Sequence, residues 1–110
     1  MKFFALDHKP IPIFDGSQIV IQDIRPMRVY PEGATLAMVL LDQDDHKAQE
    51  IPMIIWHDAR PENVIVFCPK DWQSIPGIYS SDDVANTDWI DIRTGSPAIM
   101  VDGLPRVITR

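Results

Sequence analysis

Cysteine, glycine and positive charge are scarce in this sequence, and each scarcity excludes a class of protein. A single cysteine, Cys68, cannot form an intramolecular disulfide and fits a reducing compartment. The five glycines lie too far apart to form a phosphate-cradling loop or a dinucleotide fingerprint. Ten basic residues against 16 acidic ones give a net charge of −6, which opposes attraction to nucleic acid or anionic lipid. We therefore expect no direct nucleic-acid partner.

Long apolar runs are also missing. The longest, residues 36–41, is far shorter than the roughly 20 residues that a membrane-spanning helix needs. The short apolar run that follows Lys2 stops at Asp7, before it reaches the length of a signal peptide. We expect the protein to be synthesised in the cytoplasm and not to associate with membranes.

Proline is abundant, and it divides the chain into short segments. The ten prolines, about twice the average usage, are spread from Pro10 to Pro105 and disfavour long helices. Between them lie short β-branched runs, which predict short strands at residues 19–21, 64–67, 90–92 and 106–109. Apolar residues alternate within 18–22 and again within 89–92, as in strands that are buried on one face only.

Residues 34–41 are almost continuously apolar, so they form either a strand covered on both faces or a helix. We favour the strand, because a second apolar run at 51–56 follows the polar residues 42–46, which supply a turn. The two runs predict a long hairpin with a charged tip. Pro52 cannot donate to a ladder, so we expect it at an edge or a bulge.

The predicted fold class is therefore all-β: a small barrel or sandwich of six to eight short strands in a single domain, residues 15–110. One or two helical turns are expected, at 69–75 and at 81–86. An α+β arrangement is the alternative if residues 34–41 are helical.

Residues 1–14 are predicted to form an extended N-terminal arm, because Pro10 and Pro12 interrupt its apolar residues. The arm either packs along its own domain as an edge or docks on a neighbouring subunit. With the acidic hairpin tip, it supplies the candidate partner-binding residues: Phe3, Phe4, Ile11, Ile13, Phe14, Asp44 and Asp45.

Reactive groups are few, and structural roles account for most of them. Cys68 would need a base such as His57 to act as a nucleophile, but it ends an apolar run where a free cysteine is usually buried. The three histidines are too scattered for a zinc site. We therefore expect no metal, no cofactor and no catalytic residue.

Two acidic groups have alternative interpretations. The first, Asp42, Asp44 and Asp45, lacks the glycine and glutamate of an EF-hand calcium loop. The second could place carboxylates together for acid–base chemistry, although caps and turns explain most of its positions; it comprises Asp82, Asp83, Asp88 and Asp91.

Three functional classes remain. The first is a non-catalytic structural or interaction protein, an accessory subunit that uses its arm to bind a protein partner or to self-assemble. In general arrangement it resembles small β subunits of viral particles, such as capsid decoration or tail accessory proteins, and incorporation in a viral particle is the narrower expectation. The second class is a small acidic inhibitor that occupies the basic groove of a nucleic-acid enzyme. The third is an enzyme that uses Cys68 with His57, or the aspartate group.

Overall fold

The computed structural model describes residues 6, 8–43, 46–57, 65–70 and 80–107, which form eight strands and one helix. In chain order these elements are β1 (Pro10–Pro12), β2 (Gln18–Val29), β3 (Ala34–Gln43), β4 (His46–Trp56), β5 (Val66–Pro69), α1 (Ser81–Asn86), β6 (Trp89–Asp91), β7 (Ile99–Val101) and β8 (Leu104–Arg106).

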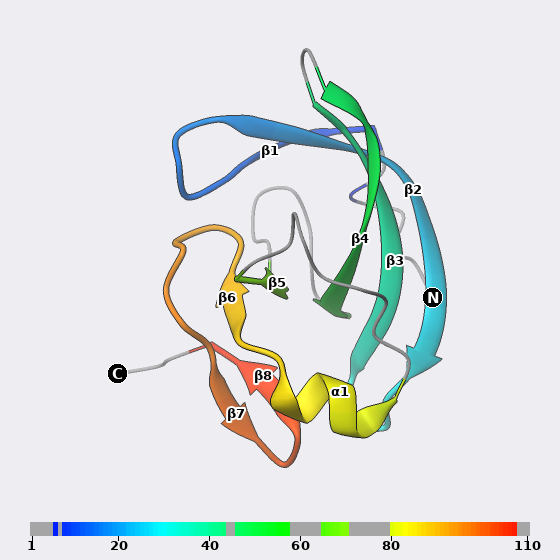
Figure 1. Cartoon of the computed structure of the whole chain (residues 1–110), viewed down its shortest axis with the longest axis vertical. Helices are drawn as coiled ribbons and strands as arrows, with labels where there is room; N and C mark the ends of the chain where they lie inside the picture. The colour runs from blue at the N-terminus through cyan, green and yellow to red at the C-terminus, as the bar shows by residue number, and fades with distance from the viewer. Residues whose placement is uncertain (1–5, 7, 44–45, 58–64, 71–79, 108–110) are drawn as a thin grey trace.

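The first six strands form one antiparallel sheet in the order β1-β2-β3-β4-β5-β6, and β7 pairs with β8 in a small second sheet. The large sheet is strongly curled (Figure 1). Its two ends approach each other, since the Phe14 N–H, after β1, donates to the Ile92 carbonyl, after β6, at 3.1 Å. The predicted all-β class is confirmed.

The central hairpin is confirmed. Residues 34–41 belong to strand β3, which pairs along its length with β4, and Leu36 lies opposite Ile54. Both faces of β3 are buried, as its continuous apolar run predicted: Leu36 packs on one face and Val39 on the other. The alternative of a helix at 34–41 is therefore wrong.

Three strands are longer than predicted: β2 continues past Pro26, and β3 and β4 extend into residues 42–46, where the turn was predicted. Strands β2, β3 and β4 contain 12, 10 and 11 residues. Pro26 lies in β2 beside a register shift and beyond the residues that pair with β1, so no ladder bond is lost on that side.

Pro52 lies inside β4, opposite Met38 of β3. The Trp56 N–H donates to Ile65 on the β5 side, and backbone direction alternates along a strand, so the Pro52 nitrogen also faces the β5 side. The described β4–β5 ladder extends only as far as Ile54. Pro52 thus occupies a position that is locally an edge, within a strand that is otherwise internal.

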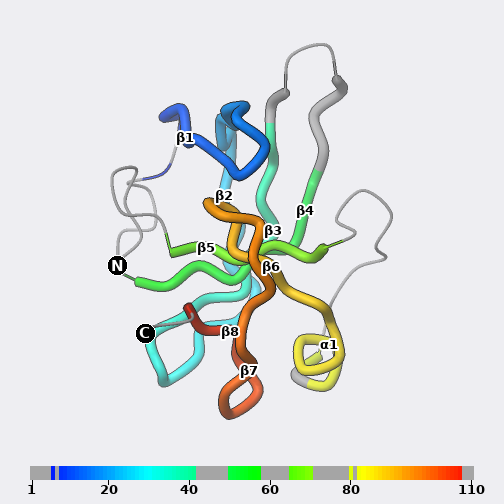
Figure 2. Tube along the Cα trace, turned by 90° about the vertical axis from the view of Figure 1, so that its left-hand side faces the viewer, coloured from blue at the N-terminus to red at the C-terminus, as the bar shows by residue number. Residues whose placement is uncertain are grey.

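The curled sheet buries apolar side chains on both of its faces. The inner face of the curl holds the larger cluster, which includes Ile11, Ile21, Val39, Met53 and Cys68. The outer face holds a second cluster, Ala34, Leu36, Ile54, Phe67, Val84, Trp89 and Leu104. Two of its members come from α1 and β8, which lie at the same end of the molecule (Figures 1 and 2).

Strand β6 corrects one prediction. Ile90 and Ile92 face the inner cluster as expected, but Trp89 and Asp91 on the opposite face are buried as well. The reason is the outer layer, because Val84 of α1 packs in the same cluster as Trp89. The alternation at 18–22 is confirmed, with buried isoleucines beside exposed or half-buried neighbours.

Helix α1 confirms the helical turn predicted at 81–86. Its N-cap is Ser80, whose hydroxyl accepts from the Asp83 N–H, while the Asp83 carboxylate accepts from the Ser80 N–H, each at 3.1 Å. The other predicted turn, at 69–75, is wrong at its start, because Pro69 ends β5 opposite Trp89. Residues 71–75 lie outside the described part of the chain. Among the residues described, no helix has the length and apolar character needed to cross a bilayer.

Replacing Ser80 with alanine should destabilise the domain, because the Asp83 N–H would lose its acceptor at the N-terminus of a six-residue helix. We expect a loss of about 1 kcal/mol in the free energy of unfolding, measured by urea denaturation. Ser96→Ala is the matched control, since Ser96 is exposed and lies outside any helix. A Ser80→Ala loss no larger than that of the control would contradict the cap.

The described part of residues 1–14 packs on the rest of the chain. β1 is an edge strand, with Ile11 opposite Ile19 of β2. Leu6 and Ile11 are fully buried in the inner cluster. Residues 1–5 and 7 lie outside the described part, and the boundary between arm and domain at residue 14 stays a prediction.

Candidate interaction surface

Six large apolar side chains are exposed among the described residues; three make up β7, two (Met27 and Val29) lie on β2, and Phe14 follows β1. Ile99, Met100 and Val101 make up the whole of β7, and all three are exposed. Phe14, at the end of β1, is exposed to 44%. We call these four residues the apolar patch.

A tight turn holds β7 in place. Val101 lies opposite Leu104, and between them Asp102 and Gly103 have positive φ angles of 54° and 82°, the conformation that joins two antiparallel strands through two residues. Leu104 is buried in the outer cluster and anchors β8. Strand β7 lies on the other side of this hairpin, where its side chains remain exposed.

A groove of about 650 Å³ connects the parts of the patch, since Phe14 and Met100 both line it. The Phe14 ring lies against Gly95, where an added Cβ would come within 3.0 Å of the ring. Because Gly95 also has a φ of +73°, a glycine is required there on two counts. The polar groups along the groove include Lys70 and Asp88.

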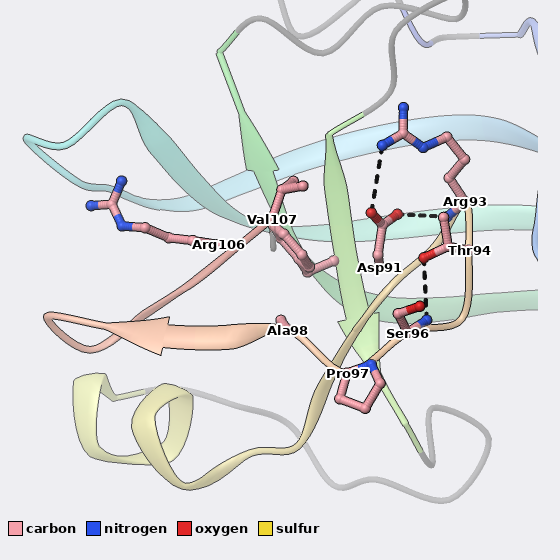
Figure 3. A pocket seen from close by; sticks show the side chains of 9 residues that line it. Asp91, Arg93, Thr94, Ser96, Pro97, Ala98, Arg106 and Val107 are labelled. Atoms are coloured by element: carbon pink, nitrogen blue, oxygen red, sulfur yellow. Dashed lines mark hydrogen bonds and ion pairs between the residues drawn. The ribbon is translucent and has the colours of Figure 1, made fainter. Parts of the chain in front are cut away.

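A second, smaller pocket of about 290 Å³ lies on the outer face of the sheet (Figure 3). Its apolar lining consists of the buried Phe67 together with Pro97, Ala98 and Val107. The buried carboxylate of Asp91 accepts from the Arg93 N–H at 2.8 Å and faces the Arg93 guanidinium at 3.7 Å.

Arg106 lines the other end of this pocket, away from Arg93 (Figure 3). Its guanidinium lies over the Trp56 ring, 4.9 Å from the ring centre, and the Trp56 Nε1–H donates to the Pro105 carbonyl at 3.2 Å. The Arg106 Nε is buried and has no hydrogen-bond partner within the described structure.

The predicted partner-binding residues have different environments. Ile11 is buried in the inner cluster, Ile13 is half-buried against it, and Phe14 is exposed. The remaining candidates lie outside the described residues: Phe3, Phe4, Asp44 and Asp45. Whether any of these residues binds a partner stays a prediction.

The structure does not bring Cys68 and His57 together. Because Ile54 lies opposite Phe67, Cys68 is level with Met53, and roughly 13 Å of extended chain separates Met53 from His57. The His57 Nε2 lies 3.4 Å from the Thr35 hydroxyl. Burial, aided by the negative charge of Asp91, raises the pKa of the Cys68 thiol to about 12.

The carboxylates of the second acidic group have separate environments. Asp83 caps α1, Asp91 contacts Arg93, and Asp82 and Asp88 are exposed. Within the described ranges, no three acidic, histidine or cysteine side chains gather in a way that could hold a metal ion. The side chain of Asp42 is not described, so the predicted acidic tip remains untested.

Sequence reasoning missed β7 and the pocket beside Asp91. A signal for β7 was present, because Ile99–Val101 precedes Asp102-Gly103, a dipeptide typical of hairpin turns. No comparable signal marks Arg93, which becomes notable only through its contact with a buried carboxylate.

Comparison with known proteins gives no family for this chain. No family model matches the sequence, no curated protein matches it, and no solved structure matches the fold.

Proposed function

We propose that this protein is a non-catalytic structural subunit that associates with a second copy of itself through the apolar patch. One observation carries the proposal: every residue of β7 is apolar and exposed, on a strand at the edge of its sheet. Exposed apolar groups on an unprotected edge strand are a common basis for pairing between chains.

The free edge of β7 has the backbone groups that such pairing needs. The Ala98 N–H donates to Trp89 on the side away from β8, and by alternation the Met100 N–H points to that same side. A second β7, antiparallel about Met100, would place Ile99 of one copy opposite Val101 of the other. Such a contact is self-complementary and contains no charged residue.

Strand β2 also exposes two large apolar side chains, Met27 and Val29, but it differs from β7 in how well its edge is protected. Beyond the residues that pair with β1, β2 contains Pro26, two register shifts, and the charged side chains of Arg25 and Arg28. These features protect edge strands from unwanted pairing. Strand β7 contains none of them, which favours it as the contact.

The other functional classes have less support. An acidic inhibitor needs carboxylates free to replace phosphates, whereas Asp15, Asp83 and Asp91 are hydrogen-bonded locally. A cysteine enzyme needs a base beside Cys68. The narrower expectation, that the assembly is a viral particle, stays a prediction.

Met100→Lys should convert the protein from a defined oligomer to a folded monomer, because it places like charges opposite each other in the proposed contact. Light scattering coupled to size exclusion measures the mass. Val29→Lys, at an exposed site on β2, is the matched control and should leave the mass unchanged.

A wild-type chain that is monomeric at its highest soluble concentration would overturn self-association. Deleting residues 1–14 is a poorer test, because the deletion also removes Leu6 and Ile11 from the core.

A further inference from the structure

We infer that the 290 Å³ pocket between Arg93 and Arg106 is a binding site for a carboxylate group attached to a small apolar body. This site is distinct from the proposed self-association, which does not use the two arginines.

Hydrogen-bond donors dominate the groups that this pocket leaves available. Two of the side-chain acceptors are engaged internally, since Asp91 Oδ1 accepts from the Arg93 N–H and the Thr94 hydroxyl oxygen accepts from the Ser96 N–H at 3.2 Å. The Arg93 guanidinium and the two hydroxyl protons remain to donate, whereas the Arg106 guanidinium is directed away over the Trp56 ring (Figure 3). The unpartnered, buried Arg106 Nε adds a donor that has no acceptor in the described structure. A ligand that supplies acceptors fits this inventory.

The formal charge of the lining residues favours a carboxylate ligand over a phosphate. The lining residues include two arginines and one aspartate, so their formal charge is +1, and a singly charged anion neutralises it. A doubly charged phosphate would leave excess negative charge beside the buried Asp91, in a protein whose net charge is already −6. A guanidinium also matches the planar geometry of a carboxylate.

The position of Arg93 suits it to receive the ligand. Its side chain is 45% exposed, and its 3.7 Å separation from Asp91 is longer than a hydrogen bond. The guanidinium therefore retains donors for a second carboxylate while Asp91 orients it. Phe67 and Val107 offer an apolar surface for the body of the ligand, and the volume suits one side chain or a small acid.

Two sources share this chemistry: a free organic acid, and an acidic side chain of a partner protein. NMR titration of the full-length protein with phenylacetate and with the peptide acetyl-Phe-Glu-Phe-amide separates them. We expect at least one probe to shift the amide signals of Arg93, Thr94 and Ser96 saturably. Binding of phenylacetate alone assigns a free acid, and binding of the peptide alone assigns a protein carboxylate.

Arg93→Gln should lower the affinity for the probe about tenfold or more, because a charge-assisted bidentate contact is lost. Arg25→Gln is the matched control. Arg25 is also an exposed arginine in an ion pair, with Glu50, but it does not line the pocket. Thermal unfolding checks that both variants fold, and Thr94→Val provides a second test at the pocket. Three results would overturn the inference: no pocket shift with either probe, equal binding of neutral phenylacetamide, or equal weakening by Arg25→Gln.

Discussion

Replacing Ile54 with aspartate is expected to unfold the domain. Ile54 has no exposed surface and lies in the middle of the sheet, opposite Leu36 of β3 and Phe67 of β5. Its side chain belongs to the outer cluster, in which every buried neighbour is apolar. A carboxylate there would be buried without a partner, which costs several kcal/mol and approaches the whole stability of a domain of this size.

Circular dichroism recorded during heating measures unfolding. The cooperative unfolding transition should be absent in the Ile54→Asp variant. Ile54→Val keeps the site apolar and should cost only about 1 kcal/mol. Val29→Asp introduces the same charge at a position that is 52% exposed, and its transition should stay close to that of the wild type. An Ile54→Asp variant with a normal transition would mean that the central hairpin is assigned wrongly.

The central hairpin could be predicted because its signals are local. Two apolar runs separated by polar turn residues are enough to suggest β3 and β4, and continuous apolarity predicts burial on both faces. The cap of α1 is local as well, since Ser80 and Asp83 lie within one turn. Such features depend on neighbours in the sequence.

The burial of β6 on both faces could not be predicted in the same way. It depends on Val84 and Leu104, which come from α1 and β8 and cover the outer face of the sheet. The length of β2 has a similar cause: Pro26 is tolerated because nothing described pairs with that side of the strand. A proline therefore marks the end of a strand only when its nitrogen, which has no N–H to donate, faces a neighbouring strand.

The candidate surfaces show the same limit. The sequence names Phe14 and Ile11 alike as partner-binding candidates, but Phe14 is exposed whereas Ile11 is buried in the inner cluster. Ile99–Val101 has the composition of a core strand. Whether such a strand is exposed depends on which other parts of the molecule pack against it, and the local sequence does not show this. The contact of Asp91 with Arg93 matters because the carboxylate lies on an apolar face, which only the fold reveals.

Cys68 is expected to resist alkylation in the folded protein. Its pKa is raised to about 12, chiefly because the buried thiol would lose solvation on ionising, and also because of the charge of Asp91. The thiolate is the reactive species, so at pH 8 the folded chain should react with iodoacetamide roughly a thousandfold more slowly than the urea-unfolded chain. Rapid reaction of the folded chain would contradict this environment and would revive the cysteine-enzyme class.

The same shift makes the stability of the protein depend on alkaline pH. The unfolded thiol loses its proton near pH 9.0, whereas the folded one keeps it until about 12, so between these values the unfolded state binds fewer protons. The stabilisation from Cys68 is therefore complete below pH 9 and falls as pH rises, by roughly 1.4 kcal/mol per pH unit. Urea denaturation of the wild type and of Cys68→Ala isolates this contribution, because every other titrating group is common to both. Parallel stability curves for the two proteins between pH 9 and 11 would show that the thiol is not buried in its neutral form.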